Sequence, residues 1–446
     1  MSLFKAYDLR GKVPEDLNED IAYKIGRAYS QLYSPKKIAV GYDIRNESLA
    51  ITNALISGLT DSGTNVLNIG LCGTEEVYFA TFHHKLDGGI MVTASHNPKG
   101  HNGMKLVGPE ARPISGDTGL QDIKALVEAA EFPNITEPGR SEENTSKKAY
   151  IEHLLSYIDI NALKPLKVVA DPGNGGAGIA LNEIAPLLPL EFIYLNETPD
   201  GDFPNGVPNP LLLENQTATA NAVREHNADL GLAWDGDFDR CFFFDADGRF
   251  IEGYYLVGLL AETILAKQPG GKIIHDPRLV WNTIKQTQEA GGKAIQSKCG
   301  HAFIKEVMRD QDAVYGGEMS AHHYFREFSY CDSGMIPWLL ITELMSKTGK
   351  SMKELVDERM SAFPCSGEIN FRVDDAPTVI SRILDAYEPR AKAIDKTDGI
   401  SMNFGEWRFN LRASNTEPLL RLNIETNGDA SLLSSVTGEL KSLIEA

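Results

Sequence analysis

Three aspartates at alternate positions form the strongest candidate for metal chemistry. They lie in the segment Asp-Gly-Asp-Phe-Asp-Arg at positions 235–240. Alternate side chains of an extended segment point to one side, so the carboxylates of Asp235, Asp237 and Asp239 can converge. Such oxygen ligands suit Mg²⁺ or Ca²⁺, but Arg240 and Ala246 stand where an EF-hand has glycine and glutamate. Because the carboxylates repel one another, the segment predicts a cation with open positions for a phosphate oxygen.

A candidate nucleophile, Ser95, lies in the segment Thr-Ala-Ser-His-Asn-Pro at positions 93–98. The apolar run at 89–92 predicts a strand before it, and open α/β sheets bind ligands at such strand ends. Lys105 or a nearby histidine could handle charge or protons. An ordinary turn is the alternative, because Ser, Asn and Pro all favour turns. A protease-like triad is not indicated, since no Gly-x-Ser-x-Gly segment occurs.

Two more polar segments could recognise a phosphorylated sugar. In the first, at positions 316–323, Glu318 and Ser320 could hydrogen-bond hydroxyl groups, and His322 could titrate near neutrality. The second, Arg-Ala-Ser-Asn-Thr-Glu-Pro at 412–418, combines an arginine with two hydroxyls and an amide, which suits a phosphate cradle. Ordinary surface polar groups and a hairpin turn are the respective alternatives.

The elements that must position these groups have the pattern of α/β domains. Short apolar runs end at Asp43, Asp171 and Asp276, and helical patterns follow at 49–59 and 218–225. Alternating strands and helices predict mainly parallel sheets. The recurring strand–aspartate pattern fits a duplicated domain and a chance recurrence equally well.

Polar, proline-bearing stretches suggest the domain boundaries. Residues 133–146 have the composition of a linker, 245–249 that of a hairpin turn, and the chain turns again near 364–369. A smaller final part shows a strand, a helix at 377–387, two strands and a helix at 431–446. We expect four domains, at residues 1–145, 146–250, 251–365 and 366–446.

Composition excludes several classes of protein. The 446-residue chain has a formal net charge of −19, which argues against a nucleic-acid partner. No apolar signal core or membrane-spanning run is evident. The five cysteines are widely spaced and form no Cys-x-x-Cys pair, which is typical of reduced thiols in the cytoplasm. We expect a cytoplasmic monomer or homodimer whose partners are small molecules.

Taken in order, the four motifs resemble those of the α-D-phosphohexomutase family, most closely its bacterial phosphomannomutase branch (phosphomannomutase/phosphoglucomutase). The opening Ala-Tyr-Asp-Leu-Arg-Gly at 6–11 is similar to the family's N-terminal signature, with Leu9 where isoleucine is common. The resemblance extends from Tyr7 to Pro418. Arg278 stands where some relatives have lysine, and Cys299 stands where threonine is common. Met319 replaces the glutamine typical of phosphoglucosamine mutases.

The resemblance implies three related α/β domains with mixed sheets and a smaller C-terminal α+β domain, TATA-binding-like, around a central cleft. It implies an intramolecular phosphotransferase, of the isomerase class, that interconverts mannose 6-phosphate and mannose 1-phosphate. Phosphoserine and a hexose 1,6-bisphosphate would be the intermediates, Mg²⁺ the cofactor, and GDP-mannose and polysaccharide synthesis the destination. A phosphoglucomutase or a dual-specificity enzyme is the alternative; a metal-dependent phosphatase and a non-catalytic sugar-phosphate binder are less favoured.

The resemblance also implies roles for individual residues. The metal ligands would be Ser95, Asp235, Asp237 and Asp239. The catalytic residues would be Ser95, Arg10, Lys105, Arg240 and His322. Substrate would be bound by His96, Asn97, Arg278, His301, Glu318, Ser320, Arg412, Ser414, Asn415 and Thr416.

Overall fold

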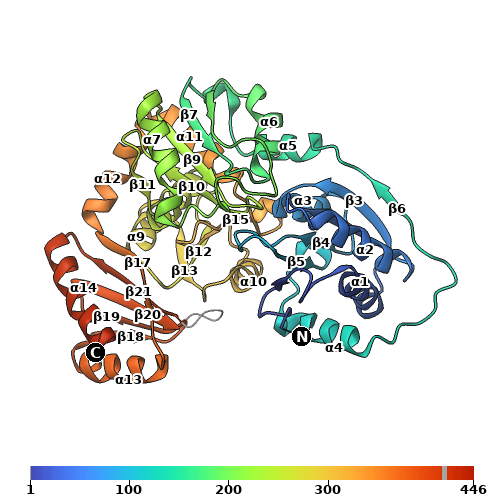
Figure 1. Ribbon diagram of the computed structural model, residues 1–446. Coiled ribbons are helices and arrows are strands. Elements are labelled where there is room, and N and C mark those ends of the chain that lie inside the picture. The colour runs from blue at the N-terminus through green and yellow to red at the C-terminus, as the bar shows by residue number, and fades with distance from the viewer. Residues whose placement is uncertain (1, 414–418) are drawn as a thin grey trace. The chain divides into compact units, whose positions relative to one another are not determined.

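The computed structural model describes residues 2–413 and 419–446 and divides the chain into two compact units. The first comprises Met1–Phe250 and Glu327–Gly349, and the second comprises Ile251–Arg326 and Lys350–Ala446. Figure 1 labels the elements of both units.

The first sheet of the first unit has the order β1-β5-β4-β2-β3-β6. Strands β2, β3, β4 and β6 run parallel, whereas β5 is antiparallel to both β4 and β1. The strands are β1 (Leu9–Lys12), β2 (Lys37–Tyr42), β3 (Asn65–Leu71), β4 (Gly89–Val92), β5 (His101–Val107) and β6 (Ser141–Glu143). Strand β6 lies in the segment predicted to be a linker, which therefore extends the sheet instead of only joining domains.

Successive side chains of these strands point to opposite faces of the sheet, and helices cover both faces. Ile38 and Val40 of β2 pack in one apolar cluster with residues of α1, α2 and α4, whereas Ala39 packs in another with residues of α3. The helices are α1 (Glu19–Tyr33), α2 (Ser48–Thr60), α3 (Thr74–His83) and α4 (Gln121–Ala129). The result is a three-layer α/β domain, seen at the blue end of the chain in Figure 1.

The second sheet has the order β11-β10-β9-β7-β8 and is also mixed, because β10 runs antiparallel to β9. Its strands are β7 (Lys167–Asp171), β8 (Glu191–Tyr194), β9 (Leu230–Trp234), β10 (Cys241–Phe244) and β11 (Phe250–Ile251). The remaining elements of the unit are α5 (Lys148–Leu155), α6 (Ala177–Ile184), α7 (Thr217–His226), β16 (Cys331–Asp332) and α11 (Ile336–Thr348). Val169 packs against Val223 of α7, and the rings of Phe192 and Trp338 are in contact.

In the second unit, β12 pairs in parallel with β13 and β14, and β15 is antiparallel to β14. These strands are β12 (Lys272–His275), β13 (Lys293–Gln296), β14 (Tyr315–Gly317) and β15 (His323–Phe325). The accompanying helices are α8 (Gly253–Lys267), α9 (Trp281–Glu289), α10 (His301–Gln311) and α12 (Met352–Ala362). Helices α8 and α9 approach closely at Gly258, where a Cβ atom would meet the amide of Gln286 at 2.1 Å.

The C-terminal part is a smaller α+β domain. Its antiparallel sheet has the order β17-β21-β20-β19-β18, and two helices share its apolar core. The elements are β17 (Cys365–Arg372), α13 (Ala376–Tyr387), β18 (Ala393–Asp395), β19 (Ile400–Asn403), β20 (Trp407–Ala413), β21 (Leu419–Thr426) and α14 (Ala430–Glu445). Asp375 and Asp429 cap the two helices. The predicted fold class, three mixed α/β sheets followed by a smaller α+β domain, is confirmed.

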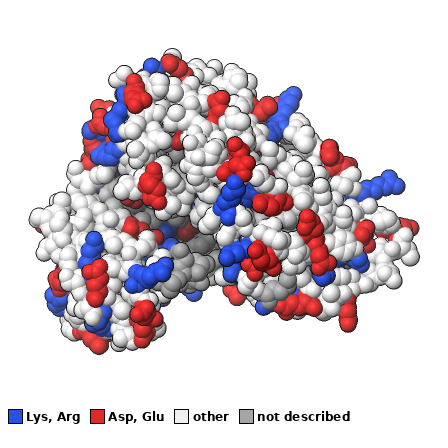
Figure 2. Space-filling view, in the orientation of Figure 1, with Lys and Arg blue, Asp and Glu red and all other residues white. Residues whose placement is uncertain are grey.

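Surface charge is mixed, with acidic and basic side chains interspersed on the face shown in Figure 2. All five cysteines are free thiols, and Cys72, Cys241 and Cys331 are buried. Within the described residues, no helix has both the length and the apolar character needed to cross a membrane.

Candidate active site

Ser95 lies on the loop after β4, as predicted, in an unusual backbone conformation. Its φ is 48°, in the left-handed region that residues with a side chain rarely adopt. Its N–H donates to Thr93 Oγ1 at 2.8 Å, and the residue is only 4% exposed. The local turn therefore holds the hydroxyl in a buried, defined position.

The Ser95 hydroxyl has two partners. Its Oγ lies 3.0 Å from Asp235 Oδ2 and 3.0 Å from His96 Nδ1. Arg240 Nη2 donates to the same ring nitrogen at 2.5 Å, so Nδ1 must act as an acceptor. Burial and the charge of Arg240 hold the pKa of His96 well below its usual value. Asp235 is therefore the acceptor of the hydroxyl proton, and the neutral His96 ring, which accepts from Arg240, lies beside the hydroxyl.

The three aspartates converge on a turn and not on an extended segment, so that detail of the prediction was wrong. The Phe238 N–H donates to the Asp235 carbonyl at 3.1 Å, and Phe238 has a φ of 46°. Its ring packs so tightly that a Cβ atom at Gly73 would lie 2.2 Å from it. Gly236 lies close to the Ser95 loop: a Cβ atom added at Gly236 would lie 2.6 Å from the Ser95 carbonyl oxygen. The turn thereby brings the carboxylates to the serine.

Buried cations partly neutralise these buried carboxylates. Arg240 donates to Asp235 through Nε at 3.0 Å and Nη2 at 2.8 Å. Lys105 Nζ lies 2.8 Å from Asp237 Oδ2 and also pairs with Asp239. Burial lowers the pKa of Lys105, but the charges of Asp237 and Asp239 raise it by more than burial lowers it. The net shift is upward, so the ammonium stays charged. Burial raises the pKa of Asp235 to about 7 against the effect of Arg240.

The aspartate trio fits a divalent cation. One oxygen from each side chain lies within 4.8 Å of the others, and all three side chains are buried. Asp237 Oδ1 is buried without a hydrogen-bond partner among the described residues, although its other oxygen accepts from Thr74 Oγ1 at 2.5 Å. An all-oxygen donor set with one unsatisfied buried oxygen suits a hard cation such as Mg²⁺.

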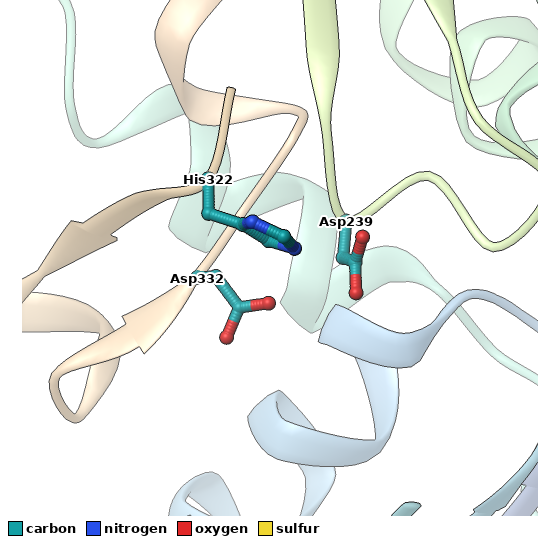
Figure 3. Close-up of side chains that lie close together, drawn as sticks. All are labelled: Asp239, His322 and Asp332. Carbon is teal, nitrogen blue, oxygen red and sulfur yellow. The ribbon is translucent and has the colours of Figure 1, made fainter. Parts of the chain in front are cut away.

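Two further groups of the first unit surround the trio. Figure 3 shows Asp332, on β16, with its carboxylate close to that of Asp239, and their nearest ligand atoms lie within 4.8 Å. Arg10 pairs with Asp8 at 2.8 Å, and its Nη1 is buried without a hydrogen-bond partner in the described part of the chain. The positive charge of Arg10 also interacts with Asp237 and Asp239. The Nη1 group of Arg10 is therefore available to donate a hydrogen bond to an anion.

The sugar-recognition candidates of the second unit gather around Arg278 and Glu318. Arg278 pairs with Asp276 at 2.8 Å, and its Nη2 lies 3.6 Å from Glu318 Oε1 and 3.4 Å from Ser320 Oγ. Glu318 accepts from the Gly300 N–H at 2.9 Å. These contacts fix a polar cluster at the turn between β14 and β15.

His322 and His301 border this cluster. His322 Nδ1 lies 3.4 Å from Ser320 Oγ and 3.6 Å from Glu318 Oε2. His301 is the first residue of α10 and follows Gly300, whose N–H donates to Glu318.

Arg412 joins the cluster through Glu368. The Glu368 carboxylate lies within 3.6 Å of side-chain nitrogens of Arg278, Arg412 and Arg421. Arg278 also pairs with Asp276 and lies beside Glu318, so three arginines stand against three carboxylates in this cluster. Ser414, Asn415 and Thr416, the other predicted phosphate contacts, lie outside the described residues.

The structure therefore forms two groups of the sequence-predicted site residues, one in each unit. The first unit brings together Ser95, His96, Lys105, Asp235, Asp237, Asp239 and Arg240, with Arg10 acting on the trio through its charge. The second brings together Arg278, Glu318, Ser320 and His322, with Arg412 linked through Glu368. The Asn97 carbonyl is bound by Arg45.

Several residues in these contacts were missed at the level of sequence. They are Arg45, Thr74, Asp276, Asp332 and Glu368. Only Asp276 carried a signal, because it ends one of the recurring apolar runs. The others become visible only when distant segments meet.

Comparison with known proteins assigns a family model to each of the four domains. Four family models match in order, described as phosphoglucomutase/phosphomannomutase alpha/beta/alpha domains I, II and III and C-terminal domain. They cover residues 1–134, 148–248, 252–363 and 368–441.

Relatives match over the full length. A Xanthomonas campestris pv. campestris protein named "Phosphohexose mutases" is 61% identical, covering 99% of this chain and 98% of the relative. Proteins named "Phosphomannomutase" from Salmonella montevideo and Escherichia coli K12 are 57% and 56% identical, covering 100% of this chain and 99% of each relative. A crystal structure of a phosphoglucomutase/phosphomannomutase family protein from Burkholderia thailandensis aligns with a TM-score of 0.89 at 28% identity, covering 100% of this chain and 97% of that one. The chain belongs to the phosphoglucomutase/phosphomannomutase family.

Proposed function

We propose that this chain is a phosphomannomutase that moves a phosphoryl group between the O6 and O1 positions of mannose through Ser95. The observation that carries the proposal is the position of the buried Ser95 hydroxyl, 3.0 Å from Asp235 Oδ2. Asp235 belongs to the aspartate trio, in which Asp237 Oδ1 has no hydrogen-bond partner among the described residues. Relatives named "Phosphomannomutase" at 56–57% identity support mannose as the sugar.

The residues of the first unit suit phosphoryl transfer from a serine. Asp235 accepts the hydrogen bond of Ser95 Oγ, so it can take the hydroxyl proton when the serine is phosphorylated. Lys105, Arg240 and Arg10 supply positive charge where charge spreads over the phosphoryl oxygens. In this family reaction the serine gives its phosphoryl group to a sugar hydroxyl and regains one from the other end of a hexose 1,6-bisphosphate.

We propose Mg²⁺ as the metal, held by Asp235, Asp237 and Asp239 together with the Ser95 side chain. When bound, Mg²⁺ would neutralise negative charge on the phosphoryl oxygens. The support is the buried, all-oxygen donor set and the unsatisfied Asp237 Oδ1.

The residues of the second unit suit substrate binding. Glu318 and Ser320 offer acceptors to sugar hydroxyls, and His322, beside both, is a candidate for proton transfer. Arg278, His301 and Arg412, with Ser414, Asn415 and Thr416, would hold the phosphate that does not react. The three arginine side chains around Glu368 support this role, because guanidinium groups donate readily to phosphate oxygens.

Further parts of the proposal concern domains, location and pathway. Boundaries after residues 145, 250 and 365 each fall between the segments matched by successive family models. Five free cysteines support a reducing compartment, the cytoplasm. Mannose 1-phosphate would then serve GDP-mannose and polysaccharide synthesis.

Glucose is the alternative sugar, because the matched family models and the Burkholderia thailandensis structure are named for both activities. Turnover of mannose 1-phosphate and glucose 1-phosphate should be compared with Mg²⁺ and a trace of the bisphosphate. We expect the higher kcat/KM for mannose 1-phosphate. A higher value for glucose 1-phosphate would favour the alternative, and release of inorganic phosphate would indicate a phosphatase.

The nucleophile is tested by Ser95→Ala, with Ser57→Ala as the matched control. The Ser57 hydroxyl donates only to the Asn53 carbonyl of its own helix, at 2.9 Å. Ser95→Ala should remove mutase turnover and leave the thermal transition near that of the wild type, whereas Ser57→Ala should keep both. Turnover at the wild-type rate in Ser95→Ala would refute the role of Ser95.

A further inference from the structure

The Arg45 side chain donates to four backbone carbonyl groups between Ser95 and His101, in and at the end of the serine loop. Its Nη2 donates to the carbonyls of Ser95 at 2.9 Å and Asn97 at 2.6 Å. Its Nη1 donates to those of Pro98 at 3.1 Å and His101 at 3.0 Å. One planar guanidinium thus holds four backbone oxygens, an arrangement that a flexible ammonium cannot reproduce.

Arg45 is itself held in place. It is 4% exposed, and its Nε pairs with Asp43 Oδ2 at 3.4 Å. The Ser48 hydroxyl donates to Asp43 at 2.6 Å, and the Asn102 amide donates to the Ser48 hydroxyl at 2.8 Å. The guanidinium also stacks over the Phe203 ring, 5.3 Å from its centroid. This network ties Arg45, through Asp43 and Ser48, to Asn102 on the strand that follows the loop.

The loop needs such support because Ser95 adopts a φ of 48°, a conformation that its Cβ disfavours. In the absence of the four donated hydrogen bonds, the loop can relax toward ordinary conformations that turn Ser95 Oγ away from Asp235. Reacting groups that are misplaced by about 1 Å can lose about 100-fold in rate.

We propose that Arg45 is a positioning residue for phosphoryl transfer, which fixes the Ser95 loop so that the hydroxyl faces Asp235. This inference rests on the proposed function. Arg45 acts through the loop backbone, so its loss lowers kcat more than it raises KM.

The test compares Arg45→Gln and Arg45→Lys with Arg27→Gln in the full-length protein. Arg27 is a matched control, because it also donates to a carbonyl, that of Pro133 at 2.7 Å, and lies over the rings of Tyr23 and Phe132. For each variant, kcat and KM are measured with saturating Mg²⁺. Amide hydrogen exchange by mass spectrometry is followed over residues 93–103 and over the rest of the first unit.

We expect kcat to fall about 100-fold in Arg45→Gln, with KM changed by less than about threefold. Exchange should accelerate within residues 93–103 and stay at the wild-type rate elsewhere. Arg45→Lys, which retains the charge and some donors, should recover part of kcat, and Arg27→Gln should keep it fully.

Wild-type kcat in folded Arg45→Gln would overturn the inference. Accelerated exchange throughout the first unit in both Arg45 variants would also overturn it, because Arg45 would then serve stability in general. If the wild-type protein turns over neither sugar phosphate, the proposed function fails, and the exchange pattern alone still decides whether Arg45 fixes the loop.

Discussion

Replacing Lys105 by Met should make the protein less stable without metal and yet bind Mg²⁺ more tightly. The Lys105 side chain is 10% exposed and pairs with two carboxylates that the metal would also use, those of Asp237 and Asp239. Removing one partner of a buried ion pair costs about 3–5 kcal/mol, because the remaining charge is buried without compensation. The metal-free variant should lose about that much free energy of unfolding.

The gain in metal affinity follows from the same contacts. In the wild type, the Lys105 ammonium group already neutralises part of the negative charge of the trio. In the variant, that part of the charge is available to a divalent cation. If Mg²⁺ recovers about half of the lost 3–5 kcal/mol, its Kd falls roughly 10- to 100-fold, since about 1.4 kcal/mol corresponds to tenfold. Turnover should nevertheless fall about 100-fold at saturating Mg²⁺, because the charge that Lys105 offers to the phosphoryl group is gone.

The assay is calorimetric titration of chelator-treated protein with Mg²⁺, accompanied by urea unfolding with and without the metal. Lys147→Met is the matched control, because Lys147 is 11% exposed and pairs with buried Glu76 outside the aspartate trio. It should lose stability comparably and show the wild-type affinity for Mg²⁺. Equal or weaker Mg²⁺ binding in Lys105→Met, or the same gain in both variants, would refute the reasoning.

Three other predictions follow from the same unit. Chelation of divalent metal should stop turnover and added Mg²⁺ should restore it; the full rate in excess chelator would contradict a metal role for the trio. Gly236→Ala should lower kcat at least 10-fold, because its Cβ would lie 2.6 Å from the Ser95 carbonyl oxygen; an unchanged kcat would show that the two loops need not touch. Burial raises the pKa of Glu75 from 4.5 to about 8, so the folded state holds this proton more tightly and stability should fall as pH rises from about 4.5 to 8, by at most about 5 kcal/mol. Urea unfolding across this pH range should show that the free energy of unfolding declines less steeply with pH in Glu75→Gln than in the wild type. Identical slopes in the two proteins would refute the raised pKa of Glu75.

Regular elements with an apolar pattern could be predicted from the sequence. The helical patterns at 49–59 and 218–225 correspond to α2 and α7, because buried residues recur on one face of each helix. Strand β6 could not be predicted, since its Ser-Glu-Glu sequence is exposed throughout. Its stability comes from backbone pairing with β3 and from an ion pair between Glu142 and Lys37, neither of which leaves an apolar signal.

Site residues could be predicted where chemistry is concentrated in one segment, and not where it is assembled from several. Ser95 and the aspartates could be proposed as site residues from residue type and spacing together with the family resemblance. The turn at Phe238 was not, because its φ of 46° depends on how the ring packs near Gly73. Arg45 gave no sign of its role, since the carbonyls that it binds lie 50 to 56 positions further along the chain.

If Ser95 carries a phosphoryl group and the trio holds Mg²⁺, as proposed, the surrounding charges make each favour the binding of the other. With all three carboxylates ionised, the trio carries three negative charges, and Lys105 and Arg240 supply two positive ones. A phosphoryl group adds about −1.5 to −2 and a divalent cation adds +2, so the two together leave the balance nearly unchanged, whereas either alone shifts it by nearly two units in a buried site. Because such coupling is reciprocal, the proposal predicts that the phosphorylated protein binds the metal more tightly by the same factor by which the metal favours phosphorylation. Under this proposal, the incomplete neutralisation of the carboxylates couples the phosphorylation state of Ser95 to the occupancy of the metal site.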